Sequence, residues 1–419
     1  MLYLLMQNFF DIRLNRFPLC RVTNGVWKSI VPHKTKLLVS AGVLLAVLIG
    51  LLPEFHARKW EKRWSDFFDY WKAQGEIFDP ELLLPPDMGE DDEFAKHPWV
   101  RLIAEGDASV LETLARMEPE NVEGYAEWHA TTDDDGIHHP MPADLADRVI
   151  RHAAAFQPEL DAFAEAVRRP GSRISSGSGS WFEEVAYMTW ITRFAPVRDL
   201  LGAAAHAASS RRNAAVLTNN IETLLRAGFL LRSSNITLDT VIGSGFETAA
   251  FEAIRSLEHI ADWPEDARRA WLAALDLRTR TPSDEFAACS RYERATWLLL
   301  IDEASQNRSQ PVLPRLTILP PLRRSFIARA KLAASEALQE VVLSENGRLV
   351  TAIKPDRIVR YEEHIKPMLG LSLPGRPISH PADMLGMTAQ FSMQGVHDAL
   401  LLRENERIAL RETIVSTLP

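Results

Sequence analysis

An uninterrupted apolar run from Leu37 to Leu52 constrains this chain more than any other feature. As a helix, its 16 residues extend roughly 24 Å, which is marginal against a bilayer hydrocarbon core of about 30 Å. Lys36 before the run and Arg58 after it can snorkel and so lengthen the effective span. A buried core helix is the alternative, and the lack of a polar stripe in the run disfavours it. We therefore expect a transmembrane anchor over residues 37–53 that contacts the lipid bilayer.

The run lacks a good site for signal peptidase, which requires small residues at positions −3 and −1. Cleavage after Ala57 would put Phe55 at −3, and cleavage after Gly50 would put Leu48 there. Basic residues flank both ends in similar number, so the positive-inside rule does not decide the orientation. A short tail before the run and a long domain after it match a signal-anchor. This arrangement predicts a single-pass protein of the inner (cytoplasmic) membrane with its body in the periplasm.

Residues 1–36 would then form a cytoplasmic tail. Within it, residues 1–30 show no clear period and fit neither a leader nor a domain. Val31 is an alternative start, because bacterial initiation can use a codon that otherwise encodes valine, and residues 1–30 would then not be translated. Starting there leaves the short leader "PHKTK" directly before the anchor, as signal-anchors usually have.

The composition is that of a folded protein, with 46% apolar and 25% charged residues. Charge is uneven: residues 1–63 hold ten Lys or Arg and three Asp or Glu, and the remainder holds 37 and 53, a net charge of about −16. Such a body repels phosphate backbones, so we expect no nucleic-acid partner. The two cysteines, Cys20 and Cys289, lie on opposite sides of the apolar run and are expected to be free thiols.

Residues 54–75 are predicted to form an aromatic juxtamembrane helix that ends at Gly75. Its large aromatic side chains recur at helical spacing and form one stripe, Trp60, Trp64, Phe67, Phe68 and Trp71. The stripe is either a platform for a partner or lipid, or an intramolecular packing face, and the second use is the more usual. Residues 76–93, with eight acids, no base and several prolines, are expected to be a linker.

The stretch "KWEKRWSDFFDYWKAQGEIFDPELLLPPDMGEDDEFAKHPW" combines a Trp-rich helix, a Gln74-Gly75-Glu76 turn, Pro85-Pro86 and the acidic run Asp91 to Ala95. It resembles the opening of a large group of uncharacterised, membrane-anchored helical proteins common in planctomycete and verrucomicrobial bacteria. Met88-Gly89 stands where the group usually has Val-Pro. Weaker similarity continues in residues 219–260 and 290–303, so the resemblance spans residues 36–303. The resemblance implies a membrane-anchored helical architecture and an envelope location. The group has no established activity that could be transferred to this chain.

The residues after the linker show helical patterning nearly throughout, which predicts an all-α protein. We expect a helical domain over 94–310, a proline-rich connector over 311–321 and a C-terminal helical region over 322–419. The apolar spacing predicts helices from 142 to 167 with a break near Pro158, and then over 213–232, 237–261, 264–276, 283–306, 322–345, 355–369 and 389–416. Because no fixed repeat appears, we expect an irregular array of antiparallel helix hairpins behind a single N-terminal transmembrane helix.

Two short motifs have some of the residues of a ligand site. Gly177 and Gly179 precede an expected helix start, where phosphate could bind, yet a third glycine and a following Lys-Ser/Thr pair are missing. A calcium loop in "DDDGIHHP" would need acids at positions taken by Thr131 and Pro142. The divalent-metal candidates of that motif are Asp133, Asp134, Asp135, His138 and His139. We favour a flexible loop for the glycine motif and a solvated loop for "DDDGIHHP". We therefore expect no cofactor and no metal.

Paired carboxylates could support acid–base hydrolysis of an envelope polymer. The obvious pairs are Glu183 with Glu184, and Glu362 with Glu363 beside His364. Adjacent helix residues point about 100° apart, so neither pair converges by itself. His206 and Glu293 would have to approach in three dimensions. Gly-x-Ser-x-Gly and His-Glu-x-x-His signatures are absent from the sequence, so we assign no catalytic residue.

These observations favour a membrane-anchored binding or scaffold module of the cell envelope, with an envelope protein as its partner. The alternative is a membrane-tethered hydrolase that acts on an envelope polymer or peptide. A deep pocket with converging acids and shifted pKa values would favour the hydrolase, and a broad shallow apolar groove would favour the scaffold.

Overall fold

The computed structural model describes residues 33–132, 137–174, 190–257, 259–278, 280–306, 320–342 and 381–418. For residues 33–50, 303–306, 320, 322–323, 336–342, 381–395 and 397–398 it describes the backbone alone. All regular secondary structure in these ranges is helical, and β-type pairing is confined there to two isolated bridges. The prediction of an all-α fold is therefore confirmed for the described part of the chain.

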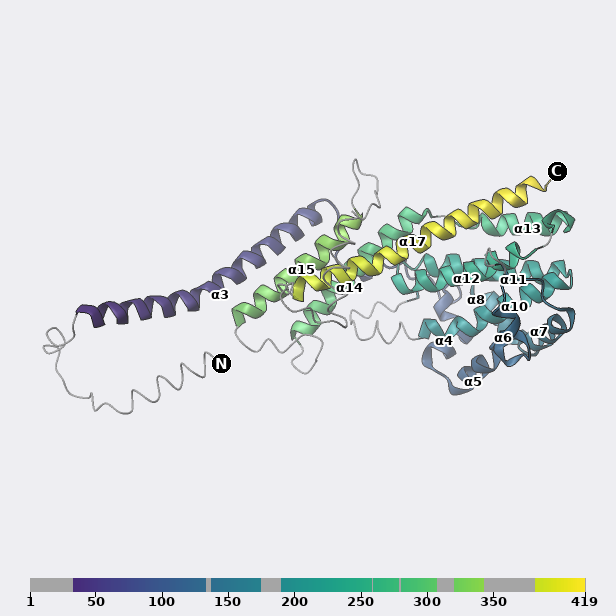
Figure 1. Cartoon of the computed structure of the whole chain (residues 1–419), viewed down its shortest axis with the longest axis horizontal. Coiled ribbons are helices and arrows are strands. Elements are labelled where there is room, and N and C mark those ends of the chain that lie inside the picture. Colours follow the sequence, from purple (N-terminus) through teal and green to yellow (C-terminus); the bar gives the residue numbers. More distant parts are fainter. Residues whose placement is uncertain are drawn as a thin grey trace.

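The helices form an elongated molecule with a compact body at one end and long helices at the other (Figure 1). The N-terminal helix and the segment after it comprise α3 (His33–Ala73), η1 (Glu81–Leu83) and η2 (Phe94–Lys96). The first part of the body comprises α4 (Pro98–Glu105), α5 (Ala108–Met117), η3 (Pro119–Asn121), α6 (Tyr125–His129), α7 (Ala143–Ala155) and α8 (Gln157–Ala166). The second part comprises η4 (Thr192–Phe194), α10 (Ala195–Ser210), α11 (Ala214–Arg232), α12 (Thr237–Arg255), η5 (Ile260–Asp262) and α13 (Glu265–Leu275). The last long helices are α14 (Pro282–Gln306), α15 (Pro320–Val342) and α17 (Pro381–Ser416).

Local side-chain chemistry explains several helix ends. The Asp107 carboxylate accepts hydrogen bonds from the first free N–H groups of α5, and the Asn213 side chain does the same for α11. Gly106 ends α4 in the left-handed conformation at φ 78°, and Gly75 follows the end of α3 at φ 86°. Of these ends, the helix start at Asn213 and the glycine at residue 75 were predicted, because capping depends on residues close in sequence.

The largest differences between predicted and observed helix bounds are at two helices. The helix expected over 237–261 ends at Arg255, and the chain then passes through a left-handed turn at His259 (φ 54°). The Ser256 hydroxyl donates a hydrogen bond to the carbonyl of Ala253, which competes with continuation of the helix. The helix expected from residue 389 begins at Pro381, and the one expected over 355–369 lies outside the described residues.

Helix α10 lies at the centre of the body, because it packs against α5, α7, α11 and α12. Its apolar residues are buried on nearly all sides, and the alanine-rich stretch from Ala203 to Ala208 lets neighbouring helices approach closely. Large aromatic side chains fill the rest of this core, with Phe163 against Phe194 and Phe246. Burial of apolar area stabilises a fold by about 25 cal/mol per Å², so this large cluster contributes strongly to the stability of the body.

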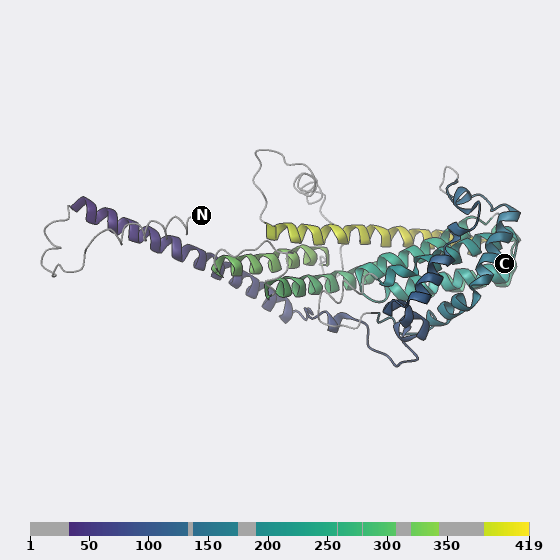
Figure 2. The same cartoon turned by 90° about the horizontal axis from the view of Figure 1, so that it is seen from below.

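The long helices form a second packed group in which α15 contacts α3, α14 and α17, and α17 continues onto α12 and α13 of the body (Figures 1 and 2). The aromatic stripe of α3 contacts α15 through cations. Arg329 lies 5.0 Å from the Trp60 ring centroid, and Lys331 lies 5.8 Å from that of Trp64. In the structure this stripe is an intramolecular packing face.

Residues 76–93 contact the helices at both ends of the segment. Glu76 accepts hydrogen bonds from Arg291 and Arg294 of α14. At the other end Glu93 is buried, and its carboxylate accepts hydrogen bonds from the backbone N–H groups of Met88 and Arg173 at 2.9 and 2.7 Å. The acidic residues at the two ends of this segment, Glu76 and Glu93, therefore form specific hydrogen bonds.

The apolar run lies within α3, which is continuous through His33–Ala73. Among the described residues, the structure contains no helix whose length and apolar character suffice to cross a bilayer. The anchor expected over 37–53 lies mostly outside the residues whose side chains are described.

Candidate functional site

Helices α11 and α12 of the body approach each other closely at a pair of glycines. A Cβ atom on Gly228 would lie 2.9 Å from the carbonyl oxygen of Gly243 and 2.6 Å from Glu247 Cγ. A Cβ on Gly243 would lie 2.7 Å from the carbonyl oxygen of Gly228. This contact brings Arg232, one turn after Gly228, against Glu247, one turn after Gly243.

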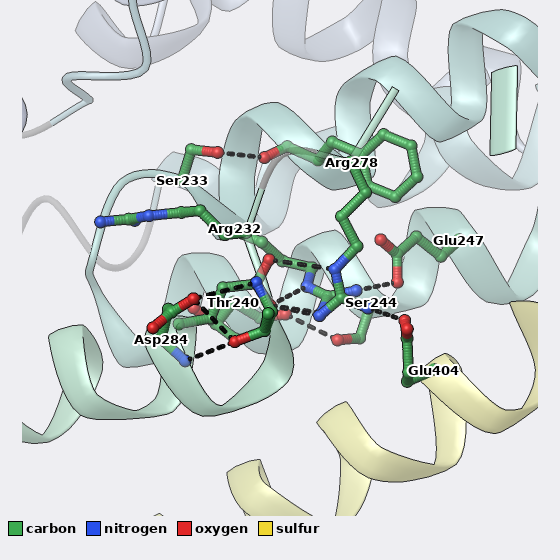
Figure 3. A network of polar contacts seen from close by, with 12 residues as sticks. Arg232, Ser233, Thr240, Ser244, Glu247, Arg278, Asp284 and Glu404 are labelled. Atoms are coloured by element: carbon green, nitrogen blue, oxygen red, sulfur yellow. Dashed lines mark hydrogen bonds and ion pairs between the residues drawn. The ribbon is translucent and has the colours of Figure 1, made fainter. Parts of the chain in front are cut away.

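Arg232 is the centre of a buried ion-pair network (Figure 3). Its guanidinium donates to Glu247 of α12 and to Glu285 of α14, where the Nε to Oε2 distance is 3.1 Å. The side chains of all three residues are 1–4% exposed. One arginine therefore ties three helices together.

The network continues to the C-terminal helix through Arg278, which lies between α13 and α14. Arg278 Nη2 donates to Glu285 Oε2 at 2.9 Å, and its Nη1 donates to Glu404 of α17. Glu404 also accepts two hydrogen bonds from Arg407 at 2.9 and 3.0 Å. Arg407 in turn donates to the carbonyl of Leu275, at the end of α13.

The protonation of the network follows from burial and pairing. Burial opposes the charge of Arg232, but Glu247 and Glu285 outweigh it and raise the Arg232 pKa. Burial raises the pKa of Glu247, whose Oε1 has no hydrogen-bond partner among the described residues. The hydrogen bonds from Arg407 lower the pKa of the less buried Glu404. The guanidinium and carboxylate groups are mostly committed to one another, so this arrangement suits holding helices together.

The sequence analysis did not single out Arg232, Glu247, Glu285 or Arg278. A signal was present, because Arg232 and Glu247 each stand among small and apolar residues in "RAGFLLR" and "GSGFETAAF". Charged residues in such surroundings are almost never buried unless paired. Their partners, however, lie 15 and 53 residues from Arg232 in the sequence.

Two of the histidines considered above meet in the body. The ring centroids of His206 on α10 and His138 lie 5.5 Å apart, and both rings pack against Trp128. The Ser256 hydroxyl lies 3.1 Å from His206 Nδ1. Burial, with smaller contributions from His138 and His129, lowers the His206 pKa to about 3. His206 is therefore a neutral core residue at ordinary pH.

Glu293, the proposed counterpart of His206, lies on α14 in a different environment. Its carboxylate accepts hydrogen bonds from the Thr237 hydroxyl at 2.9 Å and from Trp297 Nε1 at 3.2 Å. Burial raises the Glu293 pKa. The structure gives Glu293 and His206 separate partners and does not bring them together. Cys289 on the same helix is buried and unpaired with another cysteine, and burial raises its pKa to about 12.

Several other candidates lie outside the described residues: Gly177, Gly179, Glu183, Glu184, Asp133, Asp134, Asp135, Glu362, Glu363 and His364. His139 is described, and its carbonyl accepts a hydrogen bond from Trp128 Nε1 at 3.0 Å. Within the ranges that the structure describes, no three His, Cys, Asp or Glu side chains are grouped so that they could hold a metal ion.

The described residues of the body line two open surface hollows. One of about 350 Å³ is lined by charged groups that include Glu90, Lys96 and Arg169. The other, of about 570 Å³, lies between α5 and α10 and combines apolar residues such as Leu111 with Glu120 and Asp199. Neither hollow contains the ion-pair network or the histidine pair.

Comparison of the chain with protein-family models, with curated proteins and with solved structures found no match.

Proposed function

We propose that this chain is a membrane-anchored binding or scaffold protein of the cell envelope, with its body in the periplasm and an envelope protein as partner. The observation that carries the proposal is the continuity of α3. A single helix contains the apolar run 37–52 and, about two turns further on, the aromatic stripe that packs on α15. A force or displacement at the anchor would therefore reach the body through an unbroken helix.

The ion-pair network supports the scaffold part of the proposal. Arg232, Glu247 and Glu285 join three helices with side chains that are almost completely buried, and Arg278 and Glu404 add α17. In some proteins buried polar or ionic groups specify one arrangement of helices, and we propose that role for this network. A fixed arrangement suits a protein whose helix faces recognise a partner.

Membrane extraction tests the anchor and the orientation. Carbonate-washed membranes should retain the full-length chain, and protease added to intact spheroplasts should digest the body. Release by carbonate would contradict the anchor. Protection of the body in spheroplasts, with digestion after lysis, would contradict the periplasmic location.

Turnover assays separate the scaffold from the hydrolase. The purified chain should release no product from peptidoglycan, peptide or ester substrates, and cross-linking in gently solubilised membranes should capture a discrete envelope protein. Product release that disappears in Glu293→Gln, with the helical circular dichroism spectrum retained, would overturn the scaffold proposal. Thr237→Val is a suitable control, because it removes a hydrogen bond to Glu293 and leaves the carboxylate in place.

A further inference from the structure

Helix α15 runs parallel to α3 and begins beside the end of the apolar run. Arg324, in the second turn of α15, pairs with Glu54 and Glu61 of α3. Further along both helices, Arg329 lies over Trp60 and Lys331 lies over Trp64. Residue numbers therefore increase together on the two helices. Figures 1 and 2 both show α15 alongside the second half of α3.

The surface of α3 beside the start of α15 is apolar, at the point where the apolar run ends. Leu51, Leu52 and Phe55 of α3 are 59%, 61% and 72% exposed. The buried side of this segment is formed by Ala57, which is 0% exposed. Three large apolar side chains in five residues thus face solvent where the run of sixteen apolar residues ends.

The same surface is strongly basic. Arg58, Lys59, Lys62 and Arg63 of α3 are all exposed. Glu54 pairs with Arg58 and Arg324, and Glu61 lies 3.6 Å from Arg324 Nε, so these two acids offset only part of the positive charge. In a chain of net charge −9, six cations from two helices gather here around two paired acids.

We infer that this foot, made of residues 51–63 of α3 and the first turns of α15, docks on the anionic phospholipid headgroups of the bilayer. Apolar side chains at the acyl boundary combined with Lys and Arg at headgroup level are the features of interfacial helices on anionic membranes. The inference rests on the proposed anchor and adds to it a second helix, nearly 270 residues further along the chain. Contact of both α3 and α15 with the membrane surface would fix the orientation of the helix bundle relative to the anchor. Contact of α3 alone would leave the bundle free to tilt.

Photolabelling of the full-length chain in vesicles tests the foot separately from the anchor. Vesicles of phosphatidylcholine with phosphatidylglycerol would carry a photoreactive group either in the acyl chains or on the headgroup. The acyl-chain probe should label residues 37–52. The headgroup probe should label residues 55–63 and also 320–331, identified by mass spectrometry. Each lysine near an anionic surface contributes about fivefold in binding, so Lys59→Gln with Lys62→Gln should lower labelling of 320–331 severalfold.

A matched control variant is Arg151→Gln with Arg168→Gln, which removes two exposed cations from the body and should leave the labelling unchanged. Acyl-chain labelling of 37–52 without headgroup labelling of 320–331 would overturn the foot and leave the anchor standing. Absence of both the acyl-chain label and the headgroup label would overturn the anchor and the foot together. Cross-links between two copies through residues 51–55 would assign the surface to self-association and also overturn the inference.

Discussion

The chemical role of a buried residue in this body depends more on the groups that contact it than on its residue type. His206 is a potential general base in isolation, but in the structure it lies between Trp128 and His138 with a pKa near 3. Glu293 is a potential acid, and it accepts hydrogen bonds from Thr237 and Trp297. Burial disfavours the charged form of both side chains, so each is expected to affect stability when it titrates.

The His206 site predicts a pH dependence of stability. The pKa is about 3 in the folded state and 6.5 in the unfolded state, so the unfolded chain takes up the proton first. The stabilising effect is therefore complete above pH 6.5 and is lost as the pH falls toward 3. Between pH 6.5 and 5 the free energy of unfolding should fall by up to about 1.4 kcal/mol per pH unit. His206→Gln should flatten this slope in urea titrations at pH 5, 6 and 7, and an unchanged slope would contradict the assignment.

Helices in this protein meet through a few close contacts that set the positions of larger side chains. The α11–α12 pair shows this, since Gly228 and Gly243 allow backbone contact and thereby place Arg232 beside Glu247. Contact through glycine also explains why two helices of modest amphipathic character pack along most of their length.

Gly228→Ala should destabilise the body, because its Cβ would lie 2.6 Å from Glu247 Cγ and 2.9 Å from a carbonyl oxygen. Overpacking of this kind costs about 1–3 kcal/mol, which exceeds the gain of about 1 kcal/mol in helix propensity. Gly202→Ala is the control, since its Cβ would lie 3.4 Å from Ala249 Cβ, and it should be neutral or stabilising. Urea unfolding followed by circular dichroism measures both, and equal midpoints would contradict the close contact.

Arg232→Met should cost about 3–5 kcal/mol of unfolding free energy, because Glu247 and part of Glu285 would remain buried without their cation. The half-buried Arg226 is the control, since its i,i+4 pair with Glu222 is partly exposed and Arg226→Met should cost under about 1 kcal/mol. Denaturant unfolding of the two variants should differ clearly. A small effect of Arg232→Met would show that the network contributes little to stability.

Across the whole molecule, α17 connects the long helices to the body. Its earlier turns pack on α14 through Val396 and Leu400, and its last turns reach the main core through Leu410 and Ile414. Ion pairs from Glu404, Glu406 and Arg411 fix it to the body between these points. The two groups of helices are therefore expected to unfold together.

Ile414→Ala tests this connection, because Ile414 is 0% exposed and its neighbour Val415 is 44% exposed. Ile414→Ala should cost about 2–5 kcal/mol, and Val415→Ala should change stability by less than about 0.5 kcal/mol. Thermal unfolding followed by circular dichroism and by tryptophan fluorescence should give one shared midpoint for each protein. Separate midpoints in the parent chain would contradict a cooperative connection through α17.

Helix class and most helix positions could be predicted from the sequence alone. Apolar spacing at three and four residues, the Asn213 cap and the glycine at residue 75 depend on neighbours within a few positions, so they are visible without a fold. The helix predicted to continue to residue 261 ends at Arg255. There the Ser256 hydroxyl donates to the Ala253 carbonyl, and the chain turns at His259.

The sequence by itself determined that this chain is helical and that an apolar run precedes an acidic body. The tertiary structure alone decided that Arg232 meets Glu247 and Glu285, that His206 meets His138 instead of Glu293, and that α15 lies parallel to α3. These contacts join residues up to 270 positions apart. They depend on which complementary helix faces pack together, and local periodicity carries no record of that choice.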